Sequence, residues 1–125
     1  MITGRVTTAR EAVVRVAAFD GSGRPHETDA ILDTGFDGWL TLPPSLVAEL
    51  GLAWRRYGQA VLADGSMVVT NVFEATIGWD GISLTIPVDE ADVDPLIGMS
   101  LMCGFELHMP VIDGATFTLR RIAPE

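Results

Sequence analysis

The sequence of 125 residues predicts a single all-β domain that contains only one or two short helices. Short apolar segments of strand length recur along the chain, and most of them end at turns that contain glycine. Turn signals at such short intervals are typical of a β-sandwich or a β-barrel. Hydrophobic residues make up 48% of the chain, which is enough for one core, so we treat residues 1–125 as one domain.

The first predicted strands flank a turn rich in glycine. Ala12–Phe19 is rich in Val and Ala, and Asp20-Gly21-Ser22-Gly23 then turns the chain. Pro25 has no N–H to donate within a central strand, so we expect strand pairing to resume after it. The strand that follows ends at Asp33.

A short strand and the first helix come next. Residues 39–42 read as a strand that stops at Pro43-Pro44. Pro44 or Ser45 begins a helix that ends at Leu50. Gly51 is well placed as the left-handed residue that ends this helix.

The remaining strands are predicted in pairs around Asp-Gly turns. Residues 59–70 read as a hairpin in which Asp64-Gly65 is a two-residue turn. Asp80-Gly81 and Asp113-Gly114 supply two further turns. The strands predicted beside these later turns are residues 72–79, 82–86, 105–112 and 116–122.

Composition excludes several classes of partner. The formal net charge is −9, and the arginines form only isolated pairs, so we expect no nucleic-acid partner. No apolar run reaches about 18 residues, and the N-terminus lacks a signal pattern, so we expect no membrane partner and a cytoplasmic location. Cys103 is the only cysteine, which fits a reducing compartment, and we expect it to be a small buried apolar group.

A metal site is weighed against a solvated loop at Asp89-Glu90-Ala91-Asp92-Val93-Asp94. The segment lacks the central Gly and final Glu of a helix-loop-helix calcium site, so a solvated loop is favoured. His26 and His108 have no second His at ligand spacing, and we expect them at the surface or at strand edges. The sequence therefore predicts neither a metal nor another cofactor.

The segment that most strongly suggests a chemical function is Asp33-Thr34-Gly35, which follows the apolar run Ala30-Ile31-Leu32. Asp is depleted in strands and is rarely buried without a partner, so a carboxylate at this point is unusual. Gly35 allows the backbone to turn tightly. The tripeptide alone also fits an ordinary turn, in which Asp33 accepts a hydrogen bond from the N–H two residues on.

A second segment, Pro95-Leu96-Ile97-Gly98-Met99-Ser100-Leu101-Met102, places two apolar residues and a glycine before a short helical turn. With the Asp-Thr-Gly loop and the hairpin between them, it resembles the retropepsin-like aspartic proteases over residues 13–122. The resemblance is strongest to small non-viral members, in which the motifs Asp33-Thr34-Gly35-Phe36 and Leu40-Thr41-Leu42-Pro43 occur together. It implies a closed acid-protease barrel with one lobe per chain.

The resemblance also implies roles for individual residues. Asp33 is then the catalytic carboxylate, Thr34 bonds to the loop of a partner subunit, and Gly35 approaches the substrate backbone. Asp37 stands where the family often has an Asp that contacts the substrate main chain. The substrate-binding flap tip corresponds to Ala63, Asp64, Gly65 and Ser66, and the structural support to Leu96, Ile97 and Gly98.

Two positions depart from the viral pattern. Phe36 is bulkier than the Ala or Ser found there, which is expected to reshape the subsite beside the catalytic carboxylates. Met99 replaces an Arg that often follows the apolar-apolar-Gly element and pairs with the Asp at the position of Asp37. Asp37 is therefore expected to lack that partner.

One Asp-Thr-Gly motif in a chain too short for two lobes predicts a homodimer whose two-fold axis passes between two copies of Asp33. The implied activity is an aspartic endopeptidase that acts on an extended peptide or protein substrate. Two carboxylates close together share one proton, which predicts an activity optimum below neutral pH. Two chains carry twice −9, or −18, so dimerisation should be easier in mild acid or high salt.

Two other interpretations stay open. The same dimeric fold could serve peptide binding or assembly without catalysis, or an unrelated β-barrel could bind a small ligand as a stable monomer. Self-processing also stays open, although the short ends, residues 1–10 and 123–125, show no obvious pro-segment. The sequence also leaves open which terminal strands form the dimer.

Overall fold

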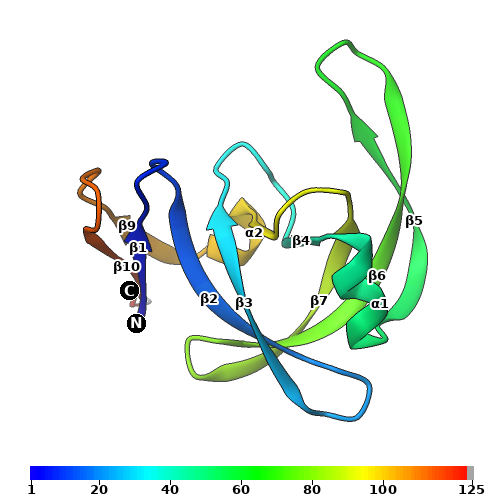
Figure 1. The fold of residues 1–125 in the computed structure, drawn as a ribbon, viewed down its shortest axis with the longest axis horizontal. Coiled ribbons are helices and arrows are strands. Elements are labelled where there is room, and N and C mark those ends of the chain that lie inside the picture. The colour runs from blue at the N-terminus through cyan, green and yellow to red at the C-terminus, as the bar shows by residue number, and fades with distance from the viewer. Residues whose placement is uncertain (124–125) are drawn as a thin grey trace.

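The computed structural model describes residues 1–123, which form a mostly-β fold with two short helices (Figure 1). The predicted class is confirmed at this level. The elements are β1 (Ile2–Val6), β2 (Ala12–Phe19), β3 (Pro25–Leu32), β4 (Leu40–Leu42), α1 (Pro44–Leu50), β5 (Ala53–Val61), β6 (Met67–Trp79), β7 (Ile82–Glu90), β8 (Leu96–Ile97), α2 (Met99–Met102), β9 (Phe105–His108) and β10 (Thr116–Arg121).

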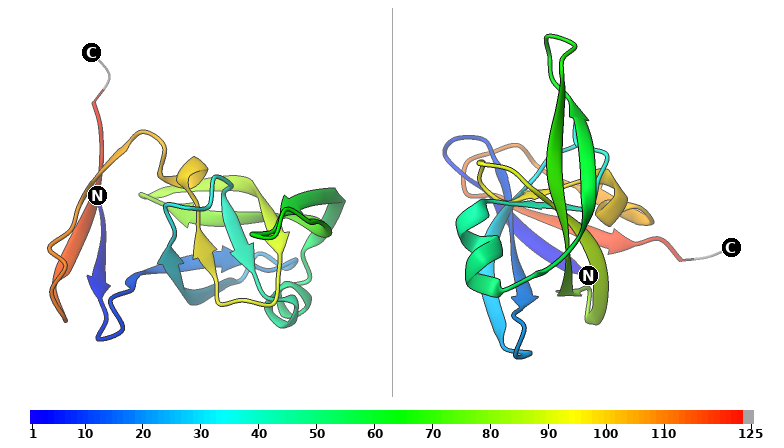
Figure 2. Two further views of the ribbon diagram at one scale, coloured as in Figure 1. Left: turned by 90° about the horizontal axis from the view of Figure 1, so that it is seen from above. Right: turned by 90° about the vertical axis from the view of Figure 1, so that its right-hand side faces the viewer.

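The strands form one sheet in the order β5-β6-β7-β4-β8-β3-β2-β1-β10-β9. A further pairing between β2 and β6 links six of these strands in a ring, and the closed barrel stays a prediction. The β5–β6 hairpin projects from one side of the molecule, and the terminal strands β1, β9 and β10 lie at the other side (Figures 1 and 2). The loop after β3 lies between these two regions (Figure 1).

The core is built from strands whose alternate residues point inward. In β2, Val14, Val16 and Ala18 are buried at alternate positions, which is the period of a half-buried strand. All three residues of β4 are buried because this strand lies between β7 and β8. Apolar burial of this kind is the main stabilising contribution to folding, and here it holds the strands that lead into the loop after β3.

The first helix forms as the sequence predicts. Pro44 occupies its first turn, where the missing N–H has no cost, and Val47 and Leu50 face the core. Gly51 ends the helix in the left-handed region with a φ of 63°, and its N–H donates to the carbonyl of Ala48. A residue with a Cβ would be strained at this position.

The β5–β6 hairpin differs from the prediction in two ways. Strand β6 is continuous from Met67 to Trp79, because residues 53–57, which were not predicted as a strand, pair with its middle. The turn is a three-residue loop: Leu62 pairs with Ser66, and Gly65, with a φ of 84°, donates to the carbonyl of Leu62. A glycine in the left-handed conformation is typical of a three-residue hairpin loop, so this turn is one residue longer than the predicted two-residue turn.

Four further predictions were wrong in detail. Strand β3 begins at Pro25 itself, which pairs with Phe19, and not after it. Strand β9 stops at His108, since the nearby Pro110 cannot donate to a ladder. Asp89 and Glu90 lie in β7 and not in a solvated loop, because Val88, Asp89 and Glu90 pair with β4. Cys103 is exposed, since it follows the last residue of α2 and precedes the turn at Gly104.

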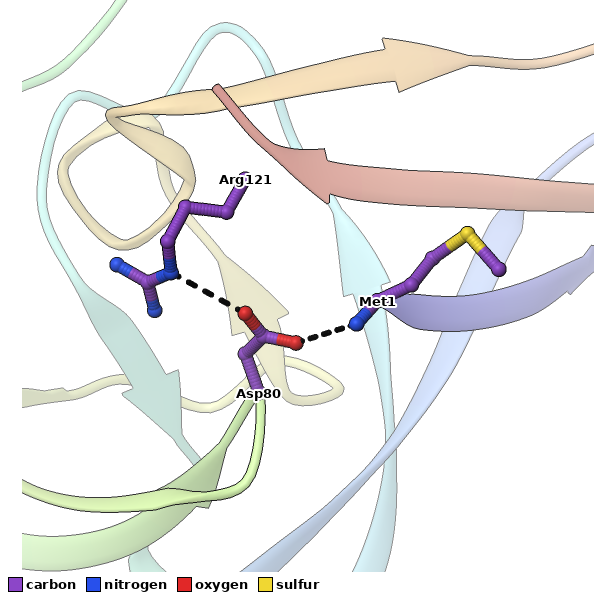
Figure 3. Close-up of polar contacts among 3 residues, drawn as sticks. All are labelled: Met1, Asp80 and Arg121. Carbon is purple, nitrogen blue, oxygen red and sulfur yellow. Dashed lines mark hydrogen bonds and ion pairs between the residues drawn. The ribbon is translucent and has the colours of Figure 1, made fainter. Parts of the chain in front are cut away.

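One carboxylate in the β6–β7 turn contacts both Met1 and Arg121 (Figure 3). Asp80 accepts a hydrogen bond from the Met1 ammonium at 2.6 Å and from Nε of Arg121 at 3.2 Å. The N-terminal ammonium, with help from Arg121, lowers the pKa of Asp80. This contact joins β1 and β10, which also pair with each other, to the turn between β6 and β7.

Asp80→Asn should lower the urea midpoint of unfolding at pH 7. A carboxylate whose pKa is lowered by folding adds stability above its unfolded pKa, about 3.9, and loses that contribution as pH falls through the folded value. The difference between variant and wild type should therefore shrink below about pH 4. Urea titrations from pH 7 to pH 3 measure this, with Asp113→Asn at an exposed turn as control. Equal midpoints at pH 7 for all three proteins would contradict it.

No helix within residues 1–123 has both the length and the apolar character needed to cross a membrane.

Candidate active site

The Asp33 carboxylate is positioned by the end of β3 and by its own loop. Strand β3 pairs in parallel with β8, and the Asp33 N–H donates to the carbonyl of Ile97 at 2.9 Å. Oδ1 of Asp33 accepts the N–H of Gly35 at 2.9 Å, which is the local bond that an ordinary turn would also make. The second carboxylate oxygen accepts no hydrogen bond within residues 1–123, so the half-buried side chain keeps an oxygen free for chemistry.

The predicted supporting element packs directly against this loop. Leu96 and Ile97 form β8 between β3 and β4, and Ile97 is fully buried. A Cβ on Gly98 would lie 2.2 Å from the Gly38 carbonyl oxygen, far inside contact distance. Only glycine therefore allows the two segments to come this close. The structure thus brings the Asp-Thr-Gly loop and the residues 96–98 together.

The ring of Phe36 packs against two glycines, one in the loop and one at the start of α2. The ring lies over Gly38, where a Cβ would be 2.5 Å from Cε1 of the ring. The same ring contacts Gly98, where a Cβ would be 2.7 Å from Cδ2. The bulky residue is accommodated because both of its neighbours are glycines.

A cleft of about 580 Å³ opens beside the loop. Its walls come from the loop, from the lower part of the β5–β6 hairpin, from the end of β7 and from the segment before β8. The lining residues are Gly35, Phe36, Asp37, Gly38, Thr41, Gln59, Ala60, Val61, Thr70, Asp89, Glu90, Ala91, Val93 and Leu96. Its concave shape and its mixed apolar and polar lining suit a peptide better than a flat surface would.

Asp89 is a residue of this cleft that the sequence interpretation missed. Burial raises the pKa of Asp89, and the nearby Asp37 raises it further, whereas Arg56 opposes the shift. A carboxylate is destabilised by partial burial and by a like charge in this way. The apolar positions Ile86 and Val88, which continue the alternation of β7, are the signal that could have placed Asp89 in a strand.

The predicted flap tip lies apart from the Asp33 loop. Ala63, Asp64, Gly65 and Ser66 are exposed and do not line the cleft. Asp64 accepts hydrogen bonds from the hydroxyl and the N–H of Ser66, which lower its pKa. These bonds stabilise the turn itself and join it to no other element.

Thr34 is exposed and borders a second, smaller groove. This groove also contains Leu107, Met109 and Val111 from β9 and the loop that follows it. Val111 and Ile112 expose 63% and 67% of their surface, which is high for apolar side chains. Within residues 1–123, no three His, Cys, Asp or Glu side chains gather in a way that could hold a metal ion.

No protein-family model and no curated protein sequence matches the chain. Solved structures do match it. The retropepsin-like aspartic protease from Rickettsia conorii aligns with a TM-score of 0.59 and 17% identity, covering 98% of this chain and 91% of that chain. EIAV protease complexed with the inhibitor HBY-793 aligns with a TM-score of 0.56 and 20% identity, covering 76% and 88%. The chain therefore has a retropepsin-like fold, as the sequence predicts.

Proposed function

We propose that this protein is an aspartic endopeptidase that acts as a homodimer. The observation that supports this most directly is the position of Asp33: in a retropepsin-like fold, its carboxylate follows β3, and the loop that it begins contributes residues 35–38 to one wall of the cleft. The matched structures are described as proteases, which agrees with a peptide substrate for this chain as well. Thr34 and Gly35 complete the catalytic loop.

The proposed reaction uses two Asp33 side chains, one from each subunit. Two carboxylates about 3 Å apart cannot both be ionised, so the pair holds one proton. The ionised carboxylate removes a proton from a water molecule between them, and the protonated one donates to the scissile carbonyl oxygen. Water attacks the carbonyl carbon directly, so no acyl-enzyme forms, and the apparent pKa values belong to the pair.

The exposed apolar surface beside Thr34 supports dimerisation on this side of the molecule. Leu107 and Val111 line the groove that Thr34 borders, and both side chains, like that of the neighbouring Ile112, are poorly covered within one chain. Exposed apolar side chains that gather near a functional loop often mark a protein interface. In the proposed dimer this surface contacts the second subunit and brings the two Asp33 side chains together.

The substrate is proposed to lie extended in the cleft. Strand β5 is the last strand of the sheet at this end, so its outer edge has unpaired backbone groups. An extended peptide can pair with such an edge and place alternate side chains in pockets. The β5–β6 hairpin, with Ala63, Asp64, Gly65 and Ser66 at its tip, then closes over the bound peptide and excludes water.

Hydrolytic activity per subunit should fall on dilution, because the proposed site requires two chains. The two chains together carry twice −9, or −18, and like charges repel less in high salt or mild acid. The protein concentration below which activity is lost should therefore be lower under those conditions. Hydrolysis of a mixed peptide library, measured over about three orders of magnitude of protein concentration and compared with sedimentation, tests this. A statine-type transition-state analogue should inhibit the reaction.

Activity should also be highest below neutral pH, because the pair of carboxylates must keep one proton. A fully active monomer, or maximal activity above about pH 8 at low salt, would contradict the proposal.

A further inference from the structure

The loop that carries the candidate site is held by the start of α2 through four consecutive carbonyls. The N–H groups of Met99, Ser100 and Gly98 donate to the carbonyls of residues 36, 38 and 39 at 2.8, 3.0 and 3.0 Å. The carbonyl of Asp37 accepts the hydroxyl of Ser100 at 2.6 Å. The main chain from residue 36 to residue 39 is thus bonded at every residue.

Ser100 contributes the one bond of this set that depends on a side chain. The first N–H groups of a helix have no partner inside the helix, so in α2 they are available to the loop. They reach three of the four carbonyls, and the hydroxyl of Ser100 reaches the fourth. A residue without a hydroxyl at position 100 would leave the carbonyl of Asp37 without a protein donor.

This bond fixes the part of the loop that faces the cleft. Phe36, Asp37 and Gly38 all line the cleft wall, and Asp37 is the residue that Ser100 holds. The hydroxyl binds the main chain of Asp37 and leaves its carboxylate free, and that carboxylate forms no ion pair within residues 1–123. A substrate would therefore meet a main chain whose position is already set before binding.

We propose that Ser100 is a positioning residue for substrate binding: its hydroxyl fixes the Asp37 main chain along the cleft, and it takes no part in the proton transfers. The inference rests on the proposed peptidase function, which gives the cleft its substrate. Ser100 acts through Asp37, so its loss should weaken substrate binding and leave the chemistry at Asp33 largely unchanged.

The kinetic test compares Ser100→Ala with Ser100→Thr and with Ser83→Ala, an exposed serine on β7 that lies outside this cleft. Losing one neutral hydrogen bond should raise KM about three- to tenfold for Ser100→Ala, with kcat within about twofold and an unchanged pH profile. Ser100→Thr keeps a hydroxyl and should restore most of the wild-type KM, and Ser83→Ala should behave as wild type. A lower kcat at unchanged KM, or no change at all, would overturn the proposal.

Hydrogen exchange separates this inference from the proposed function. In Ser100→Ala, backbone amides of residues 33–40 should exchange about tenfold faster, while those of β1 and β10 exchange as before. If the wild-type protein cleaves no peptide in an Asp33-dependent way, the proposed peptidase function is wrong. Hydrogen exchange then still tests whether Ser100 fixes the loop. Unchanged exchange in residues 33–40 would overturn the role of Ser100 even in an active enzyme.

Discussion

Asp33→Asn should reduce kcat/KM for peptide hydrolysis by at least about a thousandfold, because it removes both the general base and the general acid of the proposed pair. Asn has nearly the same shape as Asp and can still accept the N–H of Gly35 through its amide oxygen, so the loop should keep its conformation. In a homodimer one substitution changes both members of the pair. Because the substitution removes the reacting groups but leaves the loop conformation unchanged, the loss should appear in kcat and not in protein stability.

The measurement is peptide hydrolysis by wild type, Asp33→Asn and the control Asp92→Asn, which removes an exposed carboxylate outside the cleft lining. Circular dichroism and thermal unfolding of the three proteins should agree closely. Asp92→Asn should hydrolyse peptides at the wild-type rate. Equal trace hydrolysis by wild type and Asp33→Asn would instead favour the non-catalytic interpretation, in which the same fold binds peptides or assembles without cleaving them.

Gly98→Ala should be the most destabilising small substitution near the site, with a loss of about 1–3 kcal/mol and loss of most activity. The added Cβ would lie 2.2 Å from the Gly38 carbonyl oxygen and 2.7 Å from a carbon of the Phe36 ring. A side chain could rotate away, but the Gly38 oxygen belongs to the backbone. The loop would therefore have to separate from the start of α2, which also breaks the Gly98–Trp39 hydrogen bond.

Gly78→Ala is the matched control for this steric argument. Gly78 lies in β6, and a Cβ there would meet no atom within 4 Å, so the substitution should change stability only slightly. Urea unfolding and peptide hydrolysis of both variants measure the effect. Similar unfolding midpoints for Gly98→Ala and Gly78→Ala would show that the loop tolerates displacement and would contradict the expected loss.

The retropepsin-like fold can be predicted from the sequence because the motifs that indicate it are local in the chain. Asp33-Thr34-Gly35 and Leu96-Ile97-Gly98 are each short, and their order along the chain carries the resemblance. The homodimer, the closing flap and a cytoplasmic location stay predictions, because they concern a second chain, a motion and a compartment. The roles of the site residues also stay predictions until the variants above are measured.

The sequence misleads where a residue's environment depends on distant segments. Asp89 was expected in a solvated loop, but pairing with β4 draws it into a strand beside the cleft. The sequence predicts a buried Cys103, because small apolar residues usually are buried, yet this residue follows the last residue of α2 and is exposed. The sequence predicts a break in β6 at Asn71, whereas pairing with residues 53–57 keeps the strand continuous.

The sequence alone determined several of the strand segments, the first helix with its cap at Gly51, and the two motifs that carry the resemblance. These features depend on backbone sterics and on apolar alternation over a few neighbouring residues. Only the tertiary structure decided that residues 53–57 pair with β6, that Ser100 holds Asp37 and that Asp89 lines the cleft. Such contacts depend on which strands pair and in which register, and pairing is settled by the burial of the whole core rather than by any one segment.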